Sequence, residues 1–164
     1  MKLPPDFREF IELLNSENVK YLIVGGWAVA FHGHPRFTGD LDFFVEASPD
    51  NAGRLMRVLG RFGFTGLGLQ ERDFLEPDRI IQLGRPPRRI DLITGVSGVG
   101  FAEAWAGRES ARLDGIPVQV IGREALLKNK AAAGRPQDAA DLTYMSTDPP
   151  GETLGRGRPD RNQP

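Results

Sequence analysis

Two aspartates separated by one leucine enter an otherwise apolar stretch, and this arrangement constrains the fold more than any other part of the sequence. Asp40 and Asp42 flank Leu41 and are followed directly by the apolar run 43–45. Because residues two apart in a β-strand point to the same face, a strand here sets the two carboxylates side by side while Leu41 enters the core. The pair is either a solvated strand entry or the ligand set of a cation.

A third aspartate interrupts another apolar strand pattern. Asp91 lies between two apolar residues of the segment 88–94, where an unpaired, desolvated carboxylate would be costly. If this strand lies beside that of Asp40 and Asp42, three carboxylates converge, and hard oxygen ligands of this kind suit Mg²⁺ or Mn²⁺. The alternative for Asp91 is an ion pair with one of three nearby arginines, Arg85, Arg88 or Arg89.

A pair of glycines, Gly25 and Gly26, follows the apolar segment 21–24. We expect a strand that runs through these glycines into the first turn of a helix, where backbone N–H groups with no Cβ in the way can bind phosphate. By itself a glycine pair indicates only a tight turn. The two acids on the next predicted strand favour a phosphate-binding turn beside a metal site.

Helical and strand patterns alternate along the chain, which predicts an α/β (α+β) domain with a mixed sheet. Asp6 is expected to cap the first helix. We expect helices over 6–15, 25–33, 48–64, 99–107, 123–134 and 136–145, strands over 21–24, 41–46, 79–84 and 88–94, and a hairpin over 109–121 that turns at 114–115.

The composition fits one globular domain. The chain has 164 residues, of which 40% are hydrophobic and 26% charged, enough to bury a sizeable core. We expect the domain over 1–146 and a tail over 147–164 that has little to bury. The net charge of -1 neither implies nor excludes a nucleic-acid partner. Without cysteine, a secretory signal or a membrane-spanning run, we expect a cytoplasmic protein with no membrane partner.

The order of these motifs resembles that of the polymerase-β-like nucleotidyltransferase superfamily. The matching residues, spread over the segment 21–142, are Val24-Gly25-Gly26, then after a gap of thirteen residues Asp40-Leu41-Asp42-Phe43, and later Ile90-Asp91-Leu92. The glycine motif followed by Arg36 also resembles the lincosamide and aminoglycoside nucleotidyltransferases. The segments 32–45 and 126–142 are more similar to small bacterial stand-alone nucleotidyltransferase-like proteins related to abortive-infection and toxin–antitoxin components.

The resemblance implies the nucleotidyltransferase fold, a mixed sheet flanked by helices. It also implies transfer of a nucleoside monophosphate from a nucleoside triphosphate (NTP) to an acceptor, with Mg²⁺ or Mn²⁺ as cofactor. Asp40, Asp42 and Asp91 would be the catalytic and metal-binding residues, with Asp91 placed to accept the proton of the attacking oxygen. Gly25 and Gly26 would hold the β- and γ-phosphates.

Further residues of the nucleotide site each have an alternative. Arg36 would clamp a phosphate oxygen or neutralise the acids, and Thr38 would contact the nucleotide or stabilise the turn. By its match to the family motif, Lys130 would reach the triphosphate, unless it faces solvent or Lys128 takes this role. Asp138 is expected at a helix start, where its charge is favourable.

Three other side chains are expected to be structural. His32 and His34 lack a third imidazole or a thiolate with which to complete a zinc site, so we expect them to support the loop that follows them. Trp27 is expected in the core, with stacking on a nucleotide base as the alternative.

Only two short helices follow the last predicted strand, whereas the antibiotic-modifying relatives are expected to carry a further helical domain for the acceptor. Either the acceptor is large, which favours RNA or protein over a small molecule, or a second subunit completes the site as a homodimer or with a cognate partner protein. The alternative to catalysis is a silent nucleotide- or partner-binding module of a toxin–antitoxin type system.

Overall fold

The chain folds into strands and helices that alternate as the sequence predicts. The structure is a computed structural model that describes residues 2–34, 38–85 and 87–147. Within these residues the strands are β1 (Tyr21–Val24), β2 (Asp40–Val45), β3 (Ile80–Arg85), β4 (Arg88–Ile93), β5 (Glu109–Leu113) and β6 (Ile116–Val120). The helices are α1 (Pro5–Ser16), α2 (Gly25–Phe31), α3 (Pro49–Phe62), the 3-10 helix η1 (Glu71–Phe74), α4 (Phe101–Ala106), α5 (Arg123–Ala133) and α6 (Pro136–Thr147).

All six strands belong to one mixed sheet, in the order β3-β4-β2-β1-β6-β5. The central strand β1 runs antiparallel to β2 and parallel to β6, with Ile23 paired to Val120. On the other side of β2 lies β4, parallel to it, and the two hairpins β3–β4 and β5–β6 are antiparallel. This order places the strand of Asp40 and Asp42 directly beside the strand of Asp91.

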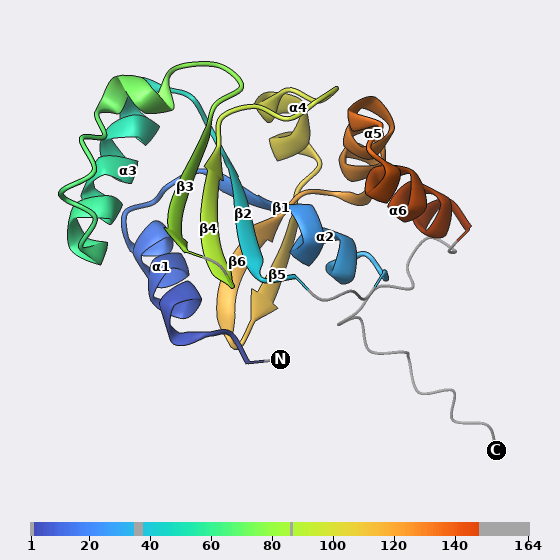
Figure 1. The fold of residues 1–164 in the computed structure, drawn as a ribbon, viewed down its shortest axis with the longest axis horizontal. Coiled ribbons are helices and arrows are strands. Elements are labelled where there is room, and N and C mark those ends of the chain that lie inside the picture. Colours follow the sequence, from blue (N-terminus) through green and yellow to red (C-terminus); the bar gives the residue numbers. More distant parts are fainter. Residues whose placement is uncertain (1, 35–37, 86, 148–164) are drawn as a thin grey trace.

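Helices cover the two faces of the sheet unequally. Figure 1 shows α1 and α3 on one side of the strands, and α2, α4, α5 and α6 on the other. Both α1 and α3 bury their apolar residues against the first side of the sheet, with Phe7, Phe10, Ile11 and Leu14 of α1 and Leu55, Val58 and Leu59 of α3 buried. The second side carries α2, α4, α5 and α6 and the charged residues described below (Figure 1).

Alternation along β2 decides which side its acids face. The ring of Phe43 lies 5.7 Å from a phenylalanine ring of α1, whereas the ring of Phe44 lies 5.1 Å from a phenylalanine ring of α4. Since side chains two apart share a face, Asp40 and Asp42 point with Phe44 to the side of α2 and α4. The sequence pattern predicted this separation of core and acidic faces.

Every helix and strand expected from the sequence is present, with ends that differ by a few residues. The expected cap is wrong: α1 begins at Pro5 with Pro4 as its N-cap, so Asp6 lies inside the first turn. No pattern predicted η1, although its Phe74 is fully buried. The expected tail falls almost wholly outside the described residues.

Among the residues that the structure describes, no helix combines the length and the apolar character needed to cross a membrane.

A buried asparagine ties the ends of β1 and β2 to the start of α3. The Asn51 amide nitrogen donates to the carbonyl oxygens of Glu46 at 2.8 Å and Lys20 at 3.1 Å, and the Asn51 Oδ1 accepts from the backbone nitrogen of Lys20 at 2.8 Å. These backbone groups lie just outside the regular ladder, so one side chain completes their hydrogen bonding. Asn51 therefore fixes the end of β2 opposite to its acids.

Replacing Asn51 by alanine is expected to lower the free energy of unfolding by about 2–4 kcal/mol, because it removes the partners of the Lys20 nitrogen and the Glu46 carbonyl as well as one hydrogen bond to the Lys20 carbonyl. Urea denaturation measures the change. Asn129→Ala is the matched control, since it removes a single hydrogen bond at the surface, to the Ser97 carbonyl, and should cost less than about 1 kcal/mol. Equal losses in the two variants would contradict the role given to Asn51.

Candidate active site

The three predicted carboxylates meet where β2 and β4 run side by side. The parallel register sets Asp42 opposite Asp91 and Asp40 opposite Arg89. Directly opposed residues on neighbouring strands face the same side of the sheet, so all four side chains project toward the side of α2. Asp91 is buried, whereas Asp40 and Asp42 are partly exposed.

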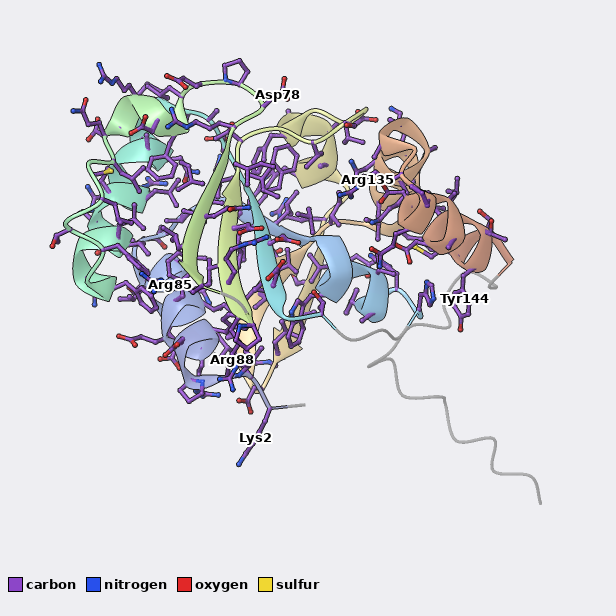
Figure 2. The ribbon with its side chains drawn as sticks, viewed as in Figure 1. Lys2, Asp78, Arg85, Arg88, Arg135 and Tyr144 are labelled. Atoms are coloured by element: carbon purple, nitrogen blue, oxygen red, sulfur yellow. The ribbon has the colours of Figure 1, made fainter. Side chains whose placement is uncertain are left out.

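Arg89 joins two of these carboxylates. Its Nε lies 2.8 Å from Asp91 Oδ1, and its Nη2 lies 3.2 Å from Asp91 Oδ2 and 3.1 Å from Asp40 Oδ2. Both alternatives considered for Asp91 therefore occur together, the convergence of acids and the ion pair with an arginine. Of the three arginine candidates, Arg85 and Arg88 instead lie at the end of the β3–β4 hairpin (Figure 2).

The Arg89 guanidinium bonds to Asp91 and Asp40 and compensates the charge of Asp42 less directly. Burial is the largest cause that raises the pKa of Asp42, to about 7, and the charge of Asp91, hydrogen bonding with Asp91 and the charge of Asp40 raise it further, against a lowering by Arg89. The pKa of Arg89 is itself raised, chiefly by its hydrogen bond to Asp91. Within the residues that the structure describes, the three acids outnumber the one guanidinium that hydrogen-bonds to them, so negative charge is in excess.

The glycine pair gives Asp42 its room. Gly25 has φ +66°, a left-handed conformation, and a Cβ added to it would overlap the Asp42 carboxylate; a Cβ added to Gly26 would press on the Thr38 side chain. The strand β1 ends at Val24 and α2 begins at Gly25, so the first turn of α2 closes directly over the acidic face of β2. Both glycines are needed for this close approach.

Thr38 and Arg36 lie in the connection that leads into β2. The Thr38 hydroxyl accepts from the backbone nitrogen of Asp40 at 3.4 Å and donates to the Asp40 carbonyl at 3.3 Å, contacts that stabilise the turn. Arg36 lies outside the described residues, so its role stays a prediction.

The side chain of Lys130 is buried, so the solvent-facing alternative is wrong. It is only 3% exposed, and its Nζ lies 2.9 Å from Asp138 Oδ1 and 3.3 Å from Asp141 Oδ2. Contact of Lys130 with a triphosphate stays a prediction. Lys128, its competitor for that role, is exposed and pairs with Glu103 at 2.6 Å.

Asp138 does more than favour a helix start. Burial alone would raise the pKa of Asp138, but hydrogen bonds from Arg135 and Lys130 lower it to about 2. Arg135 Nε lies 2.6 Å from Asp138 Oδ2, yet the Arg135 side chain stays 74% exposed. The pKa of Arg135 is raised mainly by this hydrogen bond, and the charges of Asp42 and Asp141 add to the effect. The turn between α5 and α6 thus presents a fixed guanidinium within electrostatic reach of Asp42.

Both histidines have structural partners, in agreement with the loop-supporting role expected for them. His32 Nε2 lies 2.7 Å from the carbonyl oxygen of Ile121, and His34 Nδ1 lies 3.1 Å from Asp141 Oδ1. The His34 ring also stacks on Tyr144, with ring centroids 4.1 Å apart. Trp27 is partly buried against the core. The loop after α2 is therefore anchored to α6.

Sequence reasoning missed two residues of this region. Arg89 was one of three equal candidates, although its place two residues before Asp91 on the same strand sets both side chains on one face. Arg135 was passed over in favour of Lys130. The available signal was its place beside a helix-starting proline, three residues before Asp138, a spacing at which side chains can meet.

Gly25→Ala is expected to destabilise the protein by at least about 1–2 kcal/mol, because it adds backbone strain at positive φ to an overlap with Asp42. Thermal unfolding provides the comparison. Gly60→Ala is the control: it lies in α3 with open space around it, and alanine there should be neutral or stabilising by up to about 1 kcal/mol. A Gly25→Ala protein as stable as Gly60→Ala would show that the turn does not close on Asp42.

Stability should also depend on the protonation of Asp42. Its folded pKa is raised, so the stability linked to its protonated form is fully present below pH 4 and is lost as the pH rises through about 7. We therefore compare the free energy of unfolding of Asp42→Asn with that of the wild type in metal-free buffer. The difference, variant minus wild type, should increase by roughly 1–3 kcal/mol from pH 5 to pH 8. Urea denaturation at both pH values tests this, with the exposed Glu9→Gln as control. A difference that is independent of pH would contradict it.

Comparison with known proteins connects this geometry to solved structures. No protein-family model matches the chain, and no curated protein sequence matches it. The lincosamide antibiotic adenylyltransferase LnuA, solved with lincomycin bound, is similar with a TM-score of 0.54 and 13% identity, over 88% of this chain and 97% of its own. ANT(2'')-Ia, in complex with adenylyl-2''-tobramycin, has a TM-score of 0.55 and 16% identity over 86% of each chain.

A third structure, an antigenic nucleotidyltransferase-like protein from Paracoccidioides brasiliensis, has a TM-score of 0.52 and 20% identity, over 85% of this chain and 74% of its own. The coverage corrects one expectation. The match covers 97% of the LnuA chain, so LnuA does not carry the further helical domain that was expected of the antibiotic-modifying relatives. The expected architecture is confirmed: the chain has the nucleotidyltransferase fold.

Proposed function

We propose that this protein is a metal-dependent nucleotidyltransferase that moves a nucleoside monophosphate from an NTP to an acceptor. One observation carries the proposal. Asp42 and Asp91 lie side by side on parallel strands, with Asp40 on the same face, under a glycine turn that opens a helix. The similarity in fold to LnuA and ANT(2'')-Ia supports the same reaction class.

The carboxylates fit a divalent cation by their chemistry and charge. Among the described residues no group of three or more acidic or histidine side chains is arranged to hold a metal ion, and Arg89 pairs with the carboxylates of Asp40 and Asp91. The donors are nevertheless hard oxygens. Burial, together with the charges of Asp91 and Asp40, raises the pKa of Asp42, and a bound Mg²⁺ or Mn²⁺ would favour its ionised form.

In the proposed reaction the acceptor oxygen forms a bond to the α-phosphorus of the NTP, and pyrophosphate leaves. Asp40, Asp42 and Asp91 would hold the metal, which when bound would neutralise charge on the triphosphate and activate the acceptor oxygen. Asp91, the most buried of the three, accepts the proton of the attacking oxygen. The backbone N–H groups of Gly25 and Gly26 bind the β- and γ-phosphates, since no Cβ blocks them.

A basic side chain facing the triphosphate is expected from α5 and α6, and the geometry favours Arg135. Its guanidinium is exposed, held in place by Asp138 and within electrostatic reach of Asp42. A planar guanidinium can bind two phosphate oxygens at once. Thr38 and Arg36 remain candidates for further nucleotide contacts.

The acceptor is a small molecule, RNA or protein. Two similar structures are named for antibiotics, as a lincomycin-bound enzyme and an adenylyl-tobramycin complex, and this chain spans most of both, which supports a small acceptor. RNA, protein, a homodimer and a cognate partner protein in a toxin–antitoxin setting remain proposals from the sequence, as does the cytoplasmic location.

One observation favours the alternative of a silent nucleotide- or partner-binding module. Arg89 already pairs with Asp40 and Asp91, and a guanidinium fixed there permanently would keep metal out. Such a module would bind nucleotide and form no product.

The test incubates the purified protein and Mg²⁺ with each NTP labelled at its α-phosphate, adding cellular RNA, lysate protein and a small-molecule extract as separate acceptor pools. Wild type should transfer label to one pool, and Asp42→Asn or Asp91→Asn should lower the rate by about a hundredfold or more. The control Glu9→Gln should match the wild type. Nucleotide binding without transfer would favour the silent module, and transfer unchanged in both aspartate variants would refute the proposed site.

A further inference from the structure

Arg89 stands where the site needs its cation. Its Nη2 is shared between Asp40 Oδ2 at 3.1 Å and Asp91 Oδ2 at 3.2 Å, and its Nε takes Asp91 Oδ1 at 2.8 Å. Both oxygens of Asp91 are therefore engaged, together with one oxygen of Asp40. The hydrogen bonds of this guanidinium go to Asp91 and Asp40, and it acts on Asp42 as a nearby charge.

A metal and this guanidinium need the same oxygens. Carboxylate lone pairs that accept N–H bonds are the ones that would coordinate a divalent ion. An arginine cannot give up its charge by deprotonation, so it can make way only by moving. The Arg89 side chain is 25% exposed and Asp40 is 39% exposed, which means that the guanidinium already lies at the boundary with solvent.

We propose that Arg89 is a resident counter-cation that competes with divalent metal for Asp40 and Asp91, so that metal enters as the guanidinium turns out to solvent. The inference rests on the proposed function, because it takes these carboxylates as the metal site. Arg89 acts here as a positioning residue: it holds β2 and β4 acids together while metal is absent, at the expense of metal affinity.

The competition follows from the charge balance. When all three acids are ionised, Arg89 leaves two negative charges in excess, and a single divalent ion in its place leaves one. The divalent ion is the better match, but it binds only by breaking three hydrogen bonds to a charged donor. Removing the guanidinium removes this cost and exposes the full negative charge to the metal.

The experiment titrates the nucleotide-free, full-length protein with Mn²⁺ and follows free Mn²⁺ by electron paramagnetic resonance. Arg89→Gln should bind Mn²⁺ at least about tenfold more tightly than the wild type. Arg89→Lys, which keeps the charge and loses the two-pronged contact, should be intermediate. Saturating Mn²⁺ should raise the midpoint temperature of thermal unfolding more for Arg89→Gln than for the wild type.

Arg88→Gln is the matched control. Arg88 is the neighbouring, exposed residue on β4 and alternation points it to the other face, so its removal takes away the same charge and should change the Mn²⁺ affinity by less than about threefold, since exposed charges are screened. Asp42→Asn assigns the binding to this site, because it should weaken binding in both backgrounds.

The outcomes separate the two proposals. Equal or weaker Mn²⁺ binding by Arg89→Gln, with binding still lost in Asp42→Asn, would overturn the competition and leave the proposed metal site intact. Absence of Mn²⁺ binding in every variant would overturn both. Binding by Arg89→Gln alone would support the competition in its strongest form. Arg89→Lys supplies the same comparison if Arg89→Gln fails to fold.

Discussion

The parallel register of β2 and β4 sets Asp42 directly beside Asp91, and two carboxylates in that position repel one another. Two features relieve this repulsion: the pKa of Asp42 is raised above that of an ordinary aspartate, and Arg89 bridges the remaining acids. Both depend on β2 and β4 being neighbours. The space that Gly25 leaves for the Asp42 carboxylate depends instead on α2 lying over β2. A shift of one residue would send one acid to the α1 side, into the core.

Local sequence patterns predicted what depends on a single strand or turn. Period-two alternation placed Asp40 and Asp42 on one face, and the glycine pair marked the start of α2, because both signals lie within a few residues. Alternation along β4 alone places Arg89, and not Arg88, on the face of Asp91, a signal that was not used. The bridge from Arg89 to Asp40 could not be predicted, since it depends on how two strands far apart in the chain align. The partners of Asn51 were hidden for the same reason, as they come from the ends of β1 and β2.

The burial of Lys130 was unpredictable from its own helix. Its partners Asp138 and Asp141 belong to α6, so its environment exists only when α5 and α6 pack together. A buried lysine with two aspartates is costly to desolvate and gains this back only through close contacts. The same cluster continues through Asp141 to His34 in the loop after α2. The C-terminal helices thus hold one end of the loop that leads toward the acids of β2.

The two neighbours of the central strand β1 are synthesised at very different times. Its antiparallel partner β2 leaves the ribosome soon after it, whereas its parallel partner β6 comes nearly a hundred residues later, where Val120 pairs with Ile23. Until then the fully apolar strand Tyr21–Val24 has one edge of its backbone unpaired, a template for association with other chains. The nascent chain can therefore assemble the four strands β3, β4, β2 and β1, which include the acidic strands, well before β6 and β5 complete the sheet.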